Sequence, residues 1–449
     1  MVDPNSELLD KIRQQFNSAP YPVNPLEELP KDDTDLLFKH NQVTPYYLRN
    51  QRVLDTHGTV ILDAGCGTGY TSLVLAEANP GATIVGIDLS EESIHLAQQR
   101  AQYHGRTNLE FHALSIEDIP KLGRDFDYIN CDEVLYLLPD PIKGLQVMQS
   151  VLKPEGILRA NLHSSLQRHP YYRSQKLFQL MGLLDANPGD LEIEIVAETM
   201  QALKDTVDLK ARTWRPEFGE NTPQGRSKIL SNHLLLGDKG FTIAELFAAL
   251  RAADLEFISM VNWRSWELLD LFKDPENLPV FWAMSLPDLS VEQQLQIFEL
   301  LHPVGHRLLD FWCGHPDQAK PYLPVAEWSD LEWQRTTVQL HPQLQRSEIK
   351  DVLCQKVTDY DLFEISHFIS TPAQSPVLLK STLAACLLPL WEGPQSVQVL
   401  SQRLLQISPV NPATLEPLSP HQAREILTEL LQSLEVFLYV LLELPSHPG

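Results

Sequence analysis

Short runs rich in apolar, β-branched and aromatic residues recur along positions 50–165, separated by stretches with apolar residues three and four apart. Runs of this length between polar or glycine-containing turns indicate strands, and the longer spacing indicates helices. The predicted strands lie at 60–64, 82–87, 108–113, 126–131 and 152–158. Strands that alternate with helices predict a parallel α/β sheet, whose ligands bind beyond the carboxyl ends of the strands.

The pattern becomes helical and polar after residue 165, which predicts a helical insertion over about 166–231. An amphipathic helix then follows at 241–253, where Thr242 and Glu245 complete a capping box. The run at 255–261 reads as a strand, and we expect this helix and strand to return to the sheet. These elements predict one domain over 51–265, with its core at 51–165.

The two ends of the chain have different patterns. Residues 1–50 contain helical spacing and a proline-rich turn, which predicts an arm or lid. Within this arm, residues 41–47 either fold over the mouth of a site or pack on the sheet edge. All eight tryptophans lie between Trp214 and Trp391, which supports a second, mainly helical domain at 266–449 with winged-helix-like character at its end. The apolar run at 436–444 is too short for a membrane span and is expected to form a terminal helix.

Composition narrows the classes of function. The 449 residues allow two or three domains, and 43% hydrophobic content supports full cores. Lys and Arg total 35 against 59 Asp and Glu, and the resulting net charge of −24 disfavours nucleic acid as a partner. Five scattered cysteines and the lack of a basic, then apolar N-terminus predict a cytoplasmic protein.

The most informative motif joins the first predicted strand to the helix after it. Asp63, Gly65, Gly67 and Gly69 alternate along this turn, and Asp88 ends the next strand nineteen residues later. Glycines let the backbone approach a ligand closely, and an acid at the second strand end can bind ribose hydroxyls. The third glycine comes one residue too early for a dinucleotide fingerprint. A carboxylate before the first glycine would repel a pyrophosphate and attract an amino group.

This motif resembles motif I of the class I S-adenosylmethionine-dependent methyltransferases. The resemblance continues in order through 108–113, 126–131 and the Leu-Lys-Pro-Glu-Gly segment at 152–156. It departs at Ser115, where relatives usually have Asp. The segments at 21–25 and 232–246 are similar to bacterial members that carry extra helical domains. The resemblance implies a Rossmann-like sheet with a helical insertion, a mainly helical C-terminal domain, and S-adenosylmethionine as cofactor.

The resemblance also implies which residues bind the cofactor. The glycine turn would pass under the methionine part, Asp88 would hold the ribose, and Ser115 would contact adenine, with Glu117 or Asp118 as substitutes. The complete expected set is Asp63, Ala64, Gly65, Cys66, Gly67, Gly69, Asp88, Leu89, Ser115, Ile116, Asn130 and Cys131.

Catalytic residues are harder to predict. Methyl transfer is an in-line displacement, and a base is needed only if the acceptor must lose a proton. Polar residues after the fourth and fifth strands are the candidates for facing an acceptor, and each also has an ordinary packing interpretation. His163 and Tyr136 are the catalytic candidates, and His163 is the first to test; Asp132 and Glu133 lie in the same region.

A metal site is not predicted. His302, His306, Cys313 and His315 are spaced like metal ligands, but Pro303 and Gly305 interrupt the turn that joins the first two. Structural histidines are the favoured interpretation.

Two other classes of function stay open at this stage. A catalytically silent S-adenosylmethionine-binding module that binds a partner protein would carry the same cofactor residues. A nicotinamide-dependent oxidoreductase is disfavoured by the glycine spacing. The acceptor is not identified: a protein side chain and a small molecule both remain.

Overall fold

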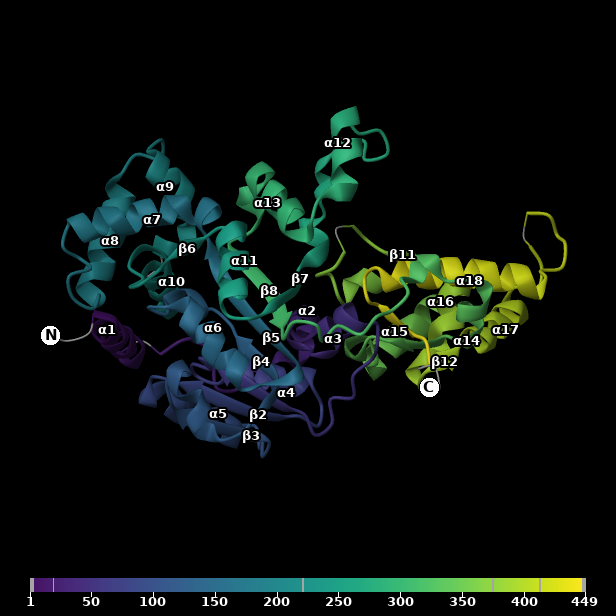
Figure 1. Cartoon of the computed structure of the whole chain (residues 1–449), viewed down its shortest axis with the longest axis horizontal. Coiled ribbons are helices and arrows are strands. Elements are labelled where there is room, and N and C mark those ends of the chain that lie inside the picture. The colour runs from purple at the N-terminus through teal and green to yellow at the C-terminus, as the bar shows by residue number, and fades with distance from the viewer. Residues whose placement is uncertain (1–3, 19, 220–221, 374, 412, 446–449) are drawn as a thin grey trace.

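The computed structural model describes residues 4–18, 20–219, 222–373, 375–411 and 413–445 (Figure 1). Its centre is an eight-stranded sheet of order β3-β2-β1-β4-β5-β8-β7, with β6 beside β5. The strands are β1 (Val60–Ala64), β2 (Thr83–Asp88), β3 (Leu109–Ala113), β4 (Phe126–Cys131), β5 (Leu152–Ser164), β6 (Gly240–Phe241), β7 (Glu256–Met260) and β8 (Leu308–Gly314). The strands β1 to β5 pair in parallel, as predicted, and β8 is antiparallel to both its neighbours. The α/β fold class is thereby confirmed.

Helices cover the sheet, and its central strands are buried. The helices of the α/β core are α4 (Tyr70–Ala78), α5 (Glu91–Tyr103), α6 (Pro141–Ser150) and α11 (Ile243–Ala252). Ile61, Leu62 and Ala64 have no exposed surface, because β1 lies between two parallel neighbours and under helices. The strand order reverses between β1 and β4, so their carboxyl ends open a crevice.

The sheet is completed by segments from the second half of the chain. The capping box predicted at α11 is present, since Thr242 Oγ1 accepts from the Glu245 amide and Glu245 accepts from that of Thr242. The strand β7 follows and forms the sheet edge, as expected. The strand β8, however, comes from beyond residue 265 and inserts between β5 and β7. We therefore propose that the α/β domain continues to Gly314 instead of ending at 265.

Four helices form the insertion: α7 (Ser165–Leu180), α8 (Asp190–Ala202), α9 (Asp208–Thr213) and α10 (Pro223–His233). They have a small core of their own that includes Phe178, Val196 and Ile229. Burial lowers the pKa of His233 in this core to about 4. Figure 1 shows the insertion at one end of the molecule, next to α1 (Pro4–Ser18).

The C-terminal region combines helices with a three-stranded sheet. Its helices are α14 (Asp330–Arg335), α15 (Ser347–Thr358), α16 (Ser381–Leu387), α17 (Val397–Ile407) and α18 (Pro420–Glu435), whereas α12 (Val280–Ser285) and α13 (Val291–Leu301) precede β8. The sheet has the order β12-β9-β13, from Gln395–Ser396, Thr337–Leu340 and Val440–Glu443, and a two-residue pair joins β10 (Phe363–Glu364) to β11 (Leu378–Leu379). The helix expected at 436–444 is wrong: β13 pairs with β9, and Val440, Leu441 and Leu442 are fully buried. An unbroken apolar run is compatible with either structure, and pairing with β9 decides the outcome.

The segment at 41–47 does not cover the crevice. It belongs to α3 (Val43–Asn50), which follows α2 (Thr34–His40). Phe38, Val43 and Tyr47 pack in the core of the C-terminal region. These helices therefore connect that region to the α/β domain, and 41–47 packs there instead of folding over the mouth of a site, which was one of the two alternatives left open by the sequence. No helix among the described residues is long and apolar enough to cross a membrane.

Candidate active site

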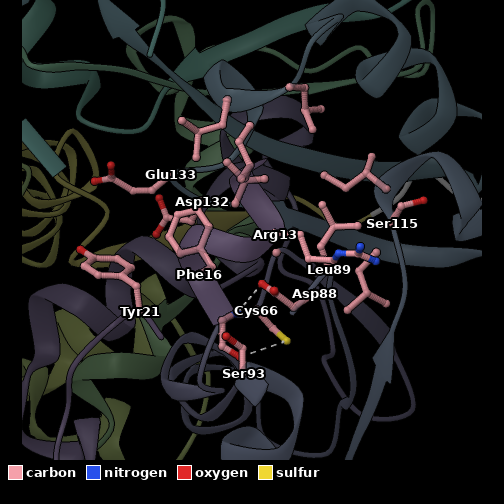
Figure 2. A pocket seen from close by; sticks show the side chains of 18 of the residues that line it. Arg13, Phe16, Tyr21, Cys66, Asp88, Leu89, Ser93, Ser115, Asp132 and Glu133 are labelled. Atoms are coloured by element: carbon pink, nitrogen blue, oxygen red, sulfur yellow. Dashed lines mark hydrogen bonds between the residues drawn. The ribbon is translucent and has the colours of Figure 1, made fainter. Parts of the chain in front are cut away.

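A cavity of about 310 Å³ lies at the carboxyl ends of β1, β2, β3 and β4 (Figure 2). Seven of the twelve predicted cofactor residues line it: Gly65, Cys66, Gly67, Asp88, Leu89, Ser115 and Ile116. The other five do not: Asp63, Ala64, Gly69, Asn130 and Cys131. The loops that follow parallel strands meet at one sheet edge, which explains why these distant segments converge.

Asp63 is turned into the protein and away from the cavity. Its side chain is buried and accepts hydrogen bonds from Ser72 Oγ at 2.6 Å and Asn130 Nδ2 at 3.0 Å. Burial raises the pKa of this carboxyl to about 6, although both hydrogen bonds oppose the shift. Asp63 thus connects β1 to α4 and to β4.

Asp88 faces the cavity and holds the glycine turn at the same time. Its carboxylate accepts from the Gly67 amide at 3.0 Å and from the Ser90 amide at 2.8 Å. Burial raises the pKa of Asp88, and the two amides act in the opposite direction. An ionised carboxylate has about four acceptor sites, so lone pairs remain for a ligand in the cavity.

The N-terminal arm forms one wall of the cavity. The strap, residues 20–26, lies on the glycine turn: the Thr68 amide donates to Tyr21 O at 3.1 Å, and Arg100 donates to Asn24 O and Pro25 O. Gly67 has φ +50°, and a Cβ there would collide with the Tyr21 carbonyl oxygen. Figure 2 shows Phe16 of α1 toward Tyr21 at this cavity, and Arg13 of α1 toward Leu89 and Ser115. Residues of α1 and of the strap therefore both line this cavity.

Two acids that follow β4 also line the cavity, near Tyr21 and Phe16 (Figure 2). The Asp132 carboxylate lies 3.5 Å from Arg159 Nη2 and 3.5 Å from His40 Nε2. Burial acts to raise its pKa, but Arg159 and His40 prevail and hold it well below the usual range. Glu133 has φ +60°, a left-handed conformation that costs energy for a residue with a Cβ. Its amide donates to Asn161 Oδ1 at 2.8 Å, which helps to maintain this conformation.

A second cavity, of about 710 Å³, adjoins the first. It lies between the strap, α5 and helices α8 and α10 of the insertion. The two cavities share a wall made by Phe16, Tyr21, Pro22, Asn24, Glu133 and Leu137. Both predicted catalytic residues, His163 and Tyr136, line the second cavity.

His163 belongs to a compact polar cluster in the second cavity. Its Nδ1 lies 2.7 Å from Asp238 Oδ1, and its Nε2 lies 3.3 Å from Arg307 Nη1. Tyr136 stacks on the imidazole with 3.7 Å between ring centroids and donates to Glu133 Oε2 at 2.8 Å. Arg307 forms an ion pair with Glu133.

The hydrogen bonds of this cluster determine the tautomer of His163. A guanidinium only donates, so Nε2 accepts from Arg307 and the proton lies on Nδ1, facing Asp238. Arg168 donates to the other oxygen of Asp238 at 2.9 Å. The two acids, Asp238 and Glu133, are therefore each paired with an arginine.

Both acids of the cluster are ionised. Burial acts to raise their pKa values, but the neighbouring His163 and arginines lower each to about 2. Neither Asp238 nor Arg307 was predicted from the sequence. Asp238 lies in the turn before the short strand β6, and Arg307 lies in the turn before β8, which was not predicted. Only the pairing of these two strands with β5 brings both residues to His163.

The histidines considered as metal ligands have separate environments. His306 stacks on Trp266 with 4.1 Å between ring centroids, His315 bonds to Leu152 O, and Cys313 is buried in β8. Across the described ranges, no group of three or more His, Cys, Asp or Glu side chains is placed to hold a metal ion.

Comparison with known proteins agrees with this geometry. Residues 55–214 match a family described as "Methyltransferase domain". An uncharacterized protein of Synechococcus is 28% identical over 319 residues, 70% of this chain and 72% of that protein. The ubiquinone biosynthesis O-methyltransferase of Actinobacillus pleuropneumoniae is 34% identical over 113 residues, which are 24% of this chain and only 47% of that enzyme.

Solved structures show the same fold over most of the chain. PKMT2 from Rickettsia typhi covers 91% of this chain and 76% of its own length, with a TM-score of 0.57 and 16% identity. Its complex with AdoHcy gives a TM-score of 0.55 over 90% of this chain and 75% of that one, also at 16% identity.

The sheet order, the glycine turn and the acid at the second strand end define a Rossmann-like methyltransferase domain. Residues 55–214 therefore form an S-adenosylmethionine-dependent methyltransferase domain, and S-adenosylmethionine is its cofactor.

Proposed function

We propose that this chain transfers a methyl group from S-adenosylmethionine in the first cavity to an acceptor in the second, and that His163 Nε2 takes the acceptor's proton. The observation that carries this proposal is the wall shared by the two cavities. Glu133 and Tyr21 lie in that wall, and the His163–Asp238 pair lies on the acceptor side of it. A donor and an acceptor placed on either side would meet there.

The residues of the first cavity suit the cofactor. Asp88 retains acceptor sites for ribose hydroxyls, and the loop at Gly65 and Gly67 leaves room for the methionine part. Asp132, ionised and held by Arg159, would take the ammonium group that the sequence assigns to Asp63. Ser115, with Ile116 beside it, would contact adenine. The cofactor, when bound, supplies an electrophilic methyl group on a sulfonium.

The protein would contribute a base, an orientation and the exclusion of water. His163 Nε2 already has its lone pair directed into the cluster, because Asp238 holds the Nδ1 proton. An acceptor hydroxyl or amine group would replace Arg307 as the partner of Nε2, and Arg307 would keep its ion pair with Glu133. The N-terminal arm would act as a lid that excludes water, and fixed placement of the reactants lowers the entropic part of the barrier.

A catalytically silent cofactor-binding module is the alternative. Such a module needs no buried histidine with an ionised acid on Nδ1 beside its cofactor cavity. The His163–Asp238 pair, with both side chains at most 1% exposed, therefore favours the enzyme.

The proposal is tested by methyl transfer from labelled S-adenosylmethionine to components of a cell extract, with the purified full chain. We expect incorporation by the wild type and its loss in His163→Gln, with equal affinity of both proteins for S-adenosylhomocysteine. Binding of S-adenosylhomocysteine without incorporation across broad extracts would support the silent module. Equal incorporation by the variant would remove His163 from the mechanism.

A further inference from the structure

We propose that the second cavity accepts an uncharged, largely apolar acceptor that presents one protic group to His163. This inference rests on the proposed function and adds a chemical class of substrate to it. It is carried by the size of the cavity, the chemistry of its walls and the pairing of its charges.

The size of the second cavity indicates a large acceptor. Its volume of about 710 Å³ is more than twice the 310 Å³ of the cofactor cavity. Cavities of roughly 300–1,000 Å³ bind molecules of drug size. A free amino acid or another small polar metabolite would leave most of this space filled with water.

The walls of the second cavity are mainly apolar, and they come from three separate elements. The strap, α5 and the insertion each contribute such side chains: Val23, Leu26, Leu96, Ile193, Leu230 and Leu235. Apolar surface favours a ligand in proportion to the area that it removes from water. The apolar side chains therefore reach the cavity from three separate elements.

The cations that line this cavity already have partners. Arg307 pairs with Glu133, and Arg100 donates to the carbonyl oxygens of Thr68, Asn24 and Pro25. Arg226 pairs with Asp190, whose side chain is 89% exposed at the rim. A carboxylate or phosphate on the acceptor would have to break such a pair or enter an apolar wall, which is costly for a charge. An uncharged acceptor requires neither.

A cluster of polar side chains lies at the end of the cavity that adjoins the cofactor cavity. His163, Tyr136 and Glu133 lie together there, beside the wall shared with the cofactor cavity. An acceptor with an apolar body and one hydroxyl or amine would place that group at His163 and bury the rest between the strap and the insertion.

The test uses 4-nonylphenol as an uncharged probe and 4-nonylbenzoate as its anionic counterpart. Their binding to the full chain saturated with S-adenosylhomocysteine is measured by calorimetry. We expect 4-nonylphenol to bind at least about tenfold more tightly than the benzoate. Equal or tighter binding of the benzoate would overturn the uncharged class. Displacement of 4-nonylphenol by an unstructured peptide would indicate a protein acceptor instead and would also overturn the uncharged class.

A substitution locates the probe in the second cavity. Val23 lines this cavity and not the cofactor cavity, and it is 47% exposed, so Val23→Lys leaves the core intact. Val399 on α17, 43% exposed, provides the matched control Val399→Lys. We expect Val23→Lys to weaken 4-nonylphenol binding about fivefold or more, with no change in S-adenosylhomocysteine affinity, and Val399→Lys to change neither.

The outcomes separate this inference from the proposed function. The acceptor class alone would be overturned if the protein bound S-adenosylhomocysteine and methylated the extract normally but did not bind 4-nonylphenol. The same holds if 4-nonylphenol bound and Val23→Lys had no effect on its binding. Loss of S-adenosylhomocysteine binding by the wild type would overturn both.

Discussion

His163 Nδ1 lies 2.7 Å from Asp238 Oδ1, and both side chains are almost completely buried. Asp238 reaches this position from the turn before β6, although 75 residues separate it from His163 in the sequence. The other oxygen of Asp238 is held by Arg168 and Gln175, each at 2.9 Å. The carboxylate therefore has one available orientation, and that orientation fixes the imidazole.

Replacing Asp238 with Asn tests this relationship. The amide can donate to Nδ1 and thereby move the imidazole proton to Nε2, which removes the base. We expect Asp238→Asn to lower the methyl-transfer rate by about 10²-fold or more, the contribution of a general base, with cofactor affinity unchanged. Asp205→Asn, at a 95% exposed position of the insertion, should keep the full rate. Retained activity in Asp238→Asn would show that this pair is only structural.

The contact between Gly67 and the strap gives a second prediction. Gly67 has φ +50°, and a Cβ there would collide with the Tyr21 carbonyl oxygen, so Gly67→Ala should displace the strap and sharply weaken S-adenosylhomocysteine binding by calorimetry. Gly123 has φ +64° with open space around its Cβ position. Gly123→Ala therefore carries the same backbone strain, about 1–2 kcal/mol, without the collision, and should bind normally. Similar losses in both variants would attribute the effect to strain alone.

Local patterns account for what could be predicted from the sequence. The strands β1 to β5, the glycine turn and the capping box at Thr242 depend on spacing within a few residues, which is readable in one sequence. The position of Asp88 at the end of β2 follows from the same reading. These features place seven predicted residues around one cavity.

The remaining features depend on contacts between distant segments. The orientation of Asp63 is set by its hydrogen bonds with Ser72 and Asn130. The sequence around Asp63 is equally compatible with a side chain that faces the ligand. The apolar run that forms β8 is interrupted in sequence by Asp310, and this strand is recognisable only from its pairing with β5 and β7. The position of the strap over the glycine turn likewise depends on contacts with Thr68 and Arg100, which are distant in the sequence. Single-sequence patterns carry no information about such pairings.

The proposed ribose contact of Asp88 is tested by Asp88→Ala. We expect S-adenosylhomocysteine affinity to fall by about 1–3 kcal/mol, the scale for a buried charged hydrogen-bonding group. Asp118→Ala, after β3 and outside the lining of both cavities, should retain wild-type affinity. Unchanged affinity in Asp88→Ala would mean that the ribose is held elsewhere. Thermal unfolding of each variant shows whether the loss of the Gly67 and Ser90 contacts alters the fold itself.

A last prediction concerns stability in acid and the connection between the two halves of the chain. His341 is fully buried against α2 and α3: its ring lies 4.6 Å from that of Phe38, and its Nε2 lies 3.0 Å from Thr44 Oγ1. Burial lowers its pKa to about 3. The Gln343 amide donates to Nδ1, so the neutral ring donates from Nε2 to Thr44.

The sign of the pH effect follows from which state binds the proton. Below about pH 6.5 the unfolded chain protonates this histidine, whereas the folded protein keeps it neutral until about pH 3. As the pH is lowered from about 6.5 to about 3, this residue should therefore reduce the free energy of unfolding by up to about 1.4 kcal/mol per pH unit. Denaturant unfolding at several pH values would show a smaller slope for His341→Gln than for the wild type. His421→Gln, at a position with a 62% exposed side chain, should keep the wild-type slope. An identical slope in His341→Gln would mean that His341 takes up its proton in the folded protein at the same pH as in the unfolded chain.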